Sequence, residues 1–129
     1  MAHPNEVAVR KAYEAFAAGD METLRSLFDP GITWHVLGRS PLARTYQGID
    51  EAFGLFGRIM QMTEGTFRAE VQDVLANDEH AVTLAHVHAH RDDKTLESEE
   101  AHVVNVKDGL ITEFWALPED QYDVDEFFS

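Results

Sequence analysis

Residues 9–36 decide the fold through three short stretches: VRKAYEAFAAGD at 9–20, LRSLF at 24–28 and ITWHV at 32–36. In the first stretch apolar residues recur at helical spacing, which predicts a helix over residues 5–18. Gly19 is the flexible residue expected after a helix, and Asp20 can cap a second, shorter helix. The apolar residues of the two helices are Val9, Ala12, Tyr13 and Phe16, then Met21, Leu24, Leu27 and Phe28. We expect the two helices to pack as a hairpin.

The third stretch begins a strand. Residues 32–37 are apolar and β-branched, and they follow a Pro30-Gly31 turn signal. Residues 38–48 are expected to form a loop. Another helix is predicted to begin near Ile49, and its broad apolar side indicates burial between a sheet and a second surface.

Four further strands are predicted at residues 66–76, 80–91, 95–106 and 110–117. Three turn signals separate them, at Asn77-Asp78, Asp92-Asp93 and Lys107-Asp108-Gly109. Such short connections make the strands antiparallel neighbours. Helices followed by a long meander predict an α+β fold, with N-terminal helices packed in a curved, mainly antiparallel sheet. We expect one domain over residues 1–129.

The amino-acid composition indicates which classes of partner to expect. Ten basic residues against twenty-four acidic ones give a formal net charge of −14. Such a surface repels phosphate backbones and anionic lipid, so neither nucleic acid nor a membrane is an expected partner. The chain has no cysteine, which excludes disulfides and thiolate chemistry. It also has no apolar run of about 20 residues and no signal-peptide pattern, so a cytoplasmic location is expected.

The opening stretch resembles that of SnoaL-like and ketosteroid-isomerase-like domains of the nuclear transport factor 2-like superfamily. In these domains a long helix, an Ala-Gly-Asp break and a short helix precede a strand that enters a cone-shaped pocket. The resemblance runs from Val9 to Asp120-Gln121-Tyr122. It implies a cystatin-like α+β barrel that works without cofactor or metal and forms a homodimer through the outer face of its sheet. It does not select a reaction, because one fold serves many functions.

His102 is the strongest candidate for a catalytic residue. It stands among valines on a strand that should be central, at a position that lies near a protonated aspartate in the ketosteroid isomerases. A histidine there can donate a hydrogen bond to a developing oxyanion or transfer a proton near neutral pH. The alternative is a core histidine satisfied by a backbone or tyrosine partner.

The first strand offers a second candidate, His35. The isomerase general base corresponds to Val36, so the aspartate itself is absent. A one-residue bulge would turn His35 into the pocket as a replacement. Without such a bulge, Trp34 and Val36 face the ligand and His35 packs elsewhere.

Glu113 is the third candidate, because it shares a face of its strand with Trp115. A carboxylate beside an indole in a dry cavity would have a raised pKa suited to proton transfer. The alternative is a glutamate paired with a basic residue or placed at the wet end of the strand.

Aromatic residues are expected to line the pocket and bind a flat hydrophobic ligand. Tyr13 can also offer a phenol, although the isomerase tyrosine corresponds to Ala12. The predicted lining residues are Trp34, Val36, Tyr13, Phe16, Phe53, Phe56 and Trp115.

The row His86, His88 and His90 permits a metal interpretation, since two histidines at i and i+2 on a strand can share one zinc ion with a third ligand from elsewhere. A polar row on a half-exposed sheet face or on a dimer surface explains the pattern equally well. We therefore expect no metal.

Two functional hypotheses follow. The first is a cofactor-free enzyme of the polyketide cyclase or ketosteroid isomerase type, acting by acid–base chemistry on a small apolar carbonyl compound, with dehydration as a variant. The base would be His35 or Glu113, and His102 would donate to the oxyanion. The second is a noncatalytic module that binds a hydrophobic molecule or serves in dimerisation.

Overall fold

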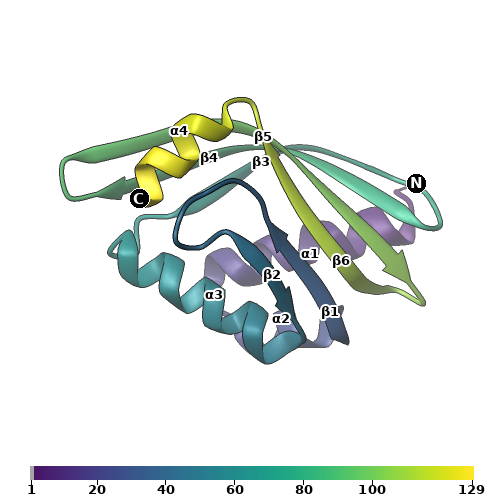
Figure 1. Ribbon diagram of the computed structural model, residues 1–129. Helices are drawn as coiled ribbons and strands as arrows, with labels where there is room; N and C mark the ends of the chain where they lie inside the picture. The colour runs from purple at the N-terminus through teal and green to yellow at the C-terminus, as the bar shows by residue number, and fades with distance from the viewer. Residues whose placement is uncertain (1) are drawn as a thin grey trace.

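A computed structural model describes residues 2–129, and it begins with the two predicted helices (Figure 1). Helix α1 (Pro4–Ala18) ends at Gly19, whose φ of 70° suits a residue without Cβ. Helix α2 (Met21–Leu27) begins after Asp20, whose side chain accepts a hydrogen bond from the Thr23 backbone N–H. The helix pair and its cap are as the sequence predicts, except that α2 ends one residue before Phe28.

The segment after α2 differs from the prediction. Strand β1 (Phe28–Val36) begins four residues before the predicted strand, and it contains Pro30-Gly31. Phe28 pairs with Ile111, and a register shift between Phe28 and Thr33 absorbs the irregular backbone. The prediction of a separate turn was wrong because this pairing partner lies more than 80 residues away.

Strand β2 (Arg44–Gln47) lies within the segment that was predicted to be a loop. It has four residues and little apolar patterning, so it is a strand only because it pairs with β1. Helix α3 (Ile49–Met62) begins where the sequence predicts. The meander is β3 (Arg68–Ala76), β4 (His80–Arg91), β5 (Lys94–Lys107) and β6 (Leu110–Pro118).

The six strands form one sheet in the order β2-β1-β6-β5-β4-β3. All neighbours are antiparallel except β1 and β6. Figure 1 shows the sheet curving over α1, α2 and α3, which lie on one side of it. The predicted α+β class with a curved, mainly antiparallel sheet is therefore confirmed. No helix within residues 2–129 has both the length and the apolar character needed to cross a membrane.

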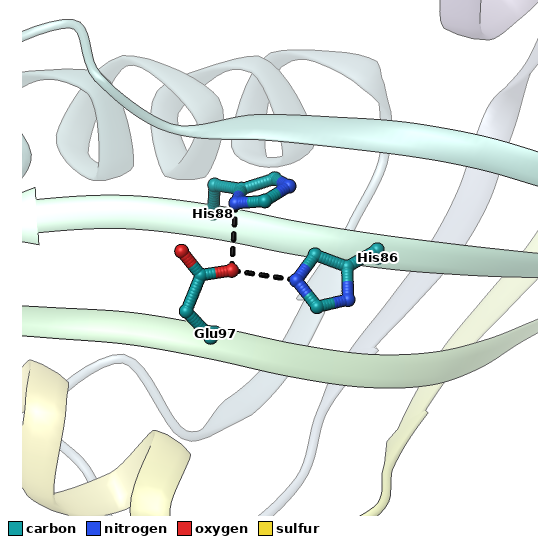
Figure 2. Close-up of side chains that lie close together, drawn as sticks. All are labelled: His86, His88 and Glu97. Carbon is teal, nitrogen blue, oxygen red and sulfur yellow. Dashed lines mark hydrogen bonds and ion pairs between the residues drawn. The ribbon is translucent and has the colours of Figure 1, made fainter.

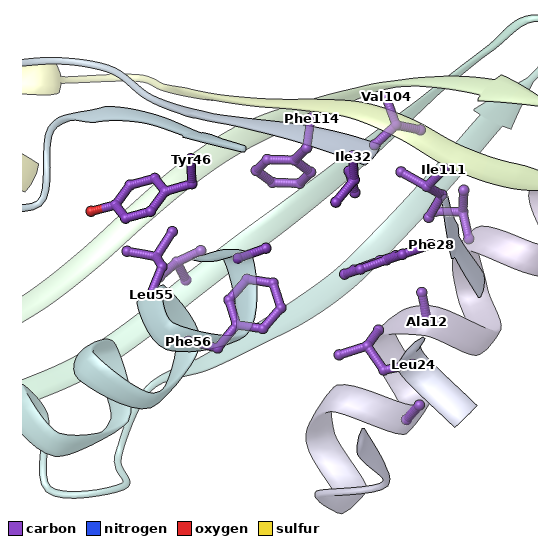
Figure 3. Close-up of a cluster of buried hydrophobic side chains, with 14 of the residues drawn as sticks. Ala12, Leu24, Phe28, Ile32, Tyr46, Leu55, Phe56, Val104, Ile111 and Phe114 are labelled. Carbon is purple, nitrogen blue, oxygen red and sulfur yellow. The ribbon is translucent and has the colours of Figure 1, made fainter. Parts of the chain in front are cut away.

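The core lies between the helices and the inner face of the sheet (Figure 3). Alternate residues of β5 and β6 enter it, because successive side chains of a strand point to opposite faces. Phe114 is buried and stacks on Trp34, with ring centroids 3.7 Å apart. The labelled core residues of Figure 3 are Ala12, Leu24, Phe28, Ile32, Tyr46, Leu55, Phe56, Val104, Ile111 and Phe114.

A fourth helix, α4 (Gln121–Phe128), was not predicted and packs against β5 and β6. Its last carbonyls accept hydrogen bonds from basic side chains of the β4–β5 hairpin: Arg91 donates to Phe127 O and Lys94 to Glu126 O. Positive charge at a helix C-terminus is favourable. Phe127 is only 2% exposed, so its burial holds the helix against the sheet.

Candidate functional site

An apolar cavity of about 180 Å³ lies between the helices and the inner face of the sheet. Its walls come from all four helices, five of the strands and the segment between β1 and β2, and most of its lining residues are aliphatic or aromatic. Val124 and Phe128 of α4 also line it, so the C-terminal helix forms part of the wall of the cavity in its own chain. The cavity is similar in size to the roughly 150 Å³ engineered cavity that accepts benzene in another protein.

Three ionisable side chains meet at the cavity wall. The Tyr13 hydroxyl of α1 lies 2.5 Å from Nδ1 of His102, and Nε2 of His102 lies 2.8 Å from Oε1 of Glu100. His102 and Glu100 have side chains only 7% and 9% exposed. All three residues line the cavity. We call this group the inner triad.

The chemistry of the partners fixes the direction of the hydrogen bonds when the imidazole is neutral. An ionised carboxylate only accepts, so Nε2–H of His102 donates to Glu100. Nδ1 is then an acceptor, and the Tyr13 hydroxyl donates to it. Burial raises the pKa of the Tyr13 phenol, a hydrogen bond to Thr83 lowers it, and the negative charge of Glu100 raises it further. The net shift is upward, so Tyr13 is a proton donor rather than a base.

Comparison with known proteins identifies the family and the fold of this chain. A family model described as a SnoaL-like domain matches residues 9–114. The chain belongs to the SnoaL-like family. Its fold is also shared with solved structures described as cystatin-like and as nuclear transport factor 2-like, as the opening residues predict.

Three relatives of this SnoaL-like protein illustrate the range of similarity. The uncharacterised protein Rv0034 of Mycobacterium tuberculosis is 34% identical over 114 residues, which cover 85% of this chain and 87% of the relative. The structure of Bal32a, from a soil-derived mobile gene cassette, has a TM-score of 0.94 at 35% identity and covers 98% of this chain and 97% of that one. IdmH of Streptomyces antibioticus, described provisionally as a polyketide cyclase, has a TM-score of 0.73 at 22% identity, with 91% and 93% covered.

The structure places most of the predicted lining residues at the cavity of this SnoaL-like protein. Six of the predicted site residues line it with side chains on the inner face or on the helices. They are His102, Trp34, Val36, Tyr13, Phe16 and Phe56. Phe53 does not line the cavity, because α3 turns it toward Phe28 and under the Arg25 guanidinium.

The other three candidates gather on the outer face of the sheet. Nε2 of His35 lies 2.6 Å from Oε2 of Glu113, and the imidazole stacks on Trp115 with ring centroids 4.9 Å apart. Nδ1 of His35 contacts Thr45 on β2. His35 borders the cavity, but both of its ring nitrogens are engaged on the outer side.

The placement of Glu113 and Trp115 in the pocket was therefore wrong. Phe114, between them in sequence, faces the core and stacks on Trp34, so its neighbours must face outward. For β1 the register shift lies before Thr33, so it does not turn His35 inward. Trp34 and Val36 face the cavity, as expected in the absence of a bulge beside His35.

Glu100 is the member of the inner triad that sequence reasoning missed. It stands two residues before His102 on β5, and that spacing places both on one face of a strand. The spacing alone would have indicated the pair. The same alternation places Glu97 and Glu99 on the opposite face, but only the assembled sheet decides which of the two faces lies against the cavity.

A second polar cluster lies on the outer face, at His86, His88 and Glu97 (Figure 2). Hydrogen bonds to Glu97 and then to Glu99 raise the pKa of His86. Hydrogen bonds from His86 and His88 lower the pKa of Glu97. Imidazoles and a carboxylate are suitable ligands for a transition metal. Within residues 2–129 this is the group whose ligand atoms lie close enough together to share one ion.

Proposed function

We propose that this SnoaL-like protein is an enzyme that uses its own side chains, without a cofactor, for acid–base chemistry on a small apolar carbonyl compound. The single observation that carries the proposal is the inner triad of Tyr13, His102 and Glu100 in an otherwise apolar cavity. Buried ionisable groups beside a cavity are costly unless paired, and their presence in a ligand-sized space favours a chemical role.

Each member of the triad has a role suited to its position. Glu100 supplies the carboxylate that takes a proton from the carbon next to the carbonyl, and the electron pair of that C–H bond moves onto the carbonyl oxygen to form an enolate. Tyr13 supplies the O–H that stabilises the enolate oxygen. In isomerisation the protonated Glu100 then returns the proton to another carbon of the enolate. In ring closure the enolate carbon attacks a second carbonyl of the same molecule, and Glu100 returns the proton to the alkoxide oxygen that forms.

His102 lies between Glu100 and Tyr13, and its protonation state decides whether the Tyr13 hydroxyl is free to donate a hydrogen bond to a substrate. When the imidazole is neutral, Tyr13 donates its hydrogen bond to Nδ1. When the imidazole is protonated, Nδ1–H donates to the phenol oxygen, and the Tyr13 O–H is free to donate to a carbonyl oxygen. Protonated His102 next to Glu100 therefore prepares Tyr13 to receive the substrate.

The cavity walls favour a compact, flat substrate. The edges and faces of Trp34, Phe56 and Phe114 surround the space with aromatic surface. The cavity volume suits a molecule with one or two rings. The fold shared with IdmH supports a polyketide-like carbonyl compound as the substrate class.

The outer face of the sheet supports a homodimer. Leu84, Ala101 and Leu117 are direct neighbours across β4, β5 and β6. Leu84 and Leu117 are 40% and 45% exposed, and such an exposed apolar patch favours association. A Leu117→Asp variant should sediment as a monomer if this patch joins two copies; an unchanged sedimentation coefficient would contradict that.

The catalytic proposal is tested with 4-nitrophenol, because its phenolate resembles a planar enolate and absorbs visible light. Wild-type protein should bind the phenolate and raise its ionised fraction at a given pH. Tyr13→Phe should weaken this binding about tenfold or more, because a hydrogen bond to a charged oxygen contributes about 1.5–3 kcal/mol. Tyr122→Phe is the matched control, because Tyr122 is 87% exposed and lies outside the cavity lining.

The same titration distinguishes an oxyanion-binding site from simple hydrophobic binding. Equal phenolate binding by wild type, Tyr13→Phe and His102→Gln would remove the inner triad from ligand recognition and favour a hydrophobic binding module. Binding of neutral benzene or toluene with no preference for phenolate would give the same result. Binding of the phenolate that is lost only in the triad variants supports the enzyme.

A further inference from the structure

The outer-face cluster has converging ligand atoms. Oε2 of Glu97 lies 2.6 Å from Nε2 of His86 and 2.7 Å from Nδ1 of His88. His86 and His88 are two residues apart on β4, and Glu97 on β5 is the direct pairing partner of His88. Figure 2 shows one nitrogen of each imidazole directed at the same carboxylate oxygen. Two rigid strands therefore hold three ligand atoms around one point.

The second ring nitrogen of each imidazole also has a carboxylate partner, which fixes the orientation of the ring. The second nitrogen of His86, Nδ1, contacts Oε1 of Glu99, and the second nitrogen of His88, Nε2, lies 3.3 Å from Oε2 of Glu70. Histidines that bind metals almost always donate their other N–H to a carboxylate, carbonyl or water, which fixes the tautomer and increases the basicity of the ligand nitrogen. Both histidines of this cluster have such a partner, contributed by β5 and β3.

We propose that His86, His88 and Glu97 form a binding site for a single zinc ion. The ligand atoms would be Nε2 of His86, Nδ1 of His88 and Oε2 of Glu97. Two imidazoles and one carboxylate form the set that zinc takes with water as its fourth ligand. The side chains are 23%, 24% and 54% exposed, so the fourth position is open to solvent.

The local negative charge favours binding of a cation at this cluster. Glu70, Glu97 and Glu99 surround two imidazoles, in a chain whose net charge is −14. Zinc ligands at about 2.0–2.2 Å from the ion lie about 3.3–3.6 Å apart in a tetrahedron. The two nitrogens now lie 2.6 and 2.7 Å from the Glu97 oxygen, so each must move away from it by roughly 0.6–1.0 Å. The partly exposed side chains have room for this movement.

The row of histidines provides a matched control. His90 is the next residue on the same face of β4, but its Nδ1 contacts Thr95, and it has no place in the cluster. His90→Ala removes one imidazole from the same strand and face, and leaves all three proposed ligands in place. The site lies on the opposite face of the sheet from the inner triad, so this proposal does not depend on the proposed function.

The experiment is a zinc titration of the untagged full-length protein at pH 7.5, after removal of metal with a chelator, read by competition with a chromophoric zinc indicator. Wild type and His90→Ala should bind one equivalent with a dissociation constant in the micromolar range or tighter. His86→Ala, His88→Ala and Glu97→Gln should each bind at least tenfold more weakly. Glu99→Gln should weaken binding about tenfold through the orientation of His86.

Cobalt(II) gives an independent reading of the ligands. Its visible absorption bands should appear in wild type and His90→Ala with the intensity of tetrahedral coordination, and should be lost in His88→Ala. Circular dichroism of each variant establishes that it is folded. Absence of one-to-one zinc binding by wild type, or binding by His86→Ala and His88→Ala that is as tight as binding by wild type, would overturn the proposal.

Discussion

The inner and outer faces of the sheet carry two clusters of the same chemistry in different surroundings. Inside, His102 and Glu100 are 7% and 9% exposed and meet a tyrosine at an apolar cavity. Outside, His86 and Glu97 are 23% and 54% exposed and belong to a network rich in carboxylates. The inner pair lies in a low dielectric, where charge and hydrogen bonding have large effects, whereas water screens the outer pair.

Neighbouring residues in sequence belong to opposite clusters. Glu99 contacts His86 on the outer face, and Glu100 contacts His102 on the inner face. Val87 is 1% exposed beside the cavity, while His88 follows it on the outside. A change at one position should therefore differ sharply from the same change one residue away.

The largest difference in unfolding free energy between two adjacent substitutions is expected on β4. Val87→Asn places an unpartnered amide in the core and removes apolar burial, so it should lower the free energy of unfolding by about 4 kcal/mol. His88→Asn, one residue along the strand, should leave the unfolding midpoint unchanged within error when no metal is added. Urea denaturation of the two variants measures the difference. Equal destabilisation would show that β4 does not separate core from solvent at this register.

A smaller difference in unfolding free energy is expected between adjacent substitutions on β5. Glu100→Ala leaves the buried His102 N–H without its acceptor, which should lower the free energy of unfolding by about 2 kcal/mol. Glu99→Ala removes only an exposed partner of His86, and its midpoint should match that of wild type at neutral pH. Chemical denaturation at pH 7 compares them. A Glu99→Ala variant as unstable as Glu100→Ala would remove the distinction between the clusters.

The smallest effect concerns pH. Because the pKa of Tyr13 is raised in the folded state, the unfolded chain loses this proton first as pH rises past about 10, the ordinary tyrosine value. Folding stability contributed by the protonated phenol is present below that pH and decreases above it, by about 1.4 kcal/mol per pH unit.

Tyr13→Phe removes this phenol, so the free energy of unfolding of the variant should fall less steeply than that of wild type between about pH 10 and 11. Tyr122→Phe should follow the wild-type curve, because that phenol is 87% exposed. Thermal melts over this pH range provide the measurement. Parallel curves for wild type and Tyr13→Phe would show that Tyr13 ionises as readily in the folded protein as in the unfolded chain.

Local signals predicted most of the fold correctly. The spacing of Val9 and Phe16, the cap at Asp20 and the turn at Asp108-Gly109 act through neighbouring residues, so they can be read directly from the chain. Strand β2 and helix α4 were missed, because their structure depends on distant partners: β2 pairs with β1, and Arg91 and Lys94 bind the end of α4.

The candidate site was predicted in part. His102 was identified because a histidine among valines on a central strand needs a partner, and the structure supplies two. Glu113 and Trp115 were assigned to the wrong face, because an error of one residue in register reverses every side chain of a strand. Register shifts at Phe28/Thr33 and Asn105/Val106 lie next to these residues and leave no signal in the local pattern.

The sequence by itself determined the family, the order of most helices and strands, and the alternation that separates Glu99 from Glu100 and Val87 from His88. The family follows from the resemblance of residues 9–36, and the other properties follow from spacing and from interactions between near neighbours. Only the tertiary structure decided which alternate set faces inward, because strand pairing and its register shifts join residues that are far apart in the chain. As a result, His102 and Glu100 lie beside an apolar cavity and a phenol, whereas His86, His88 and Glu97 lie at the solvent-exposed face, where an ion can approach.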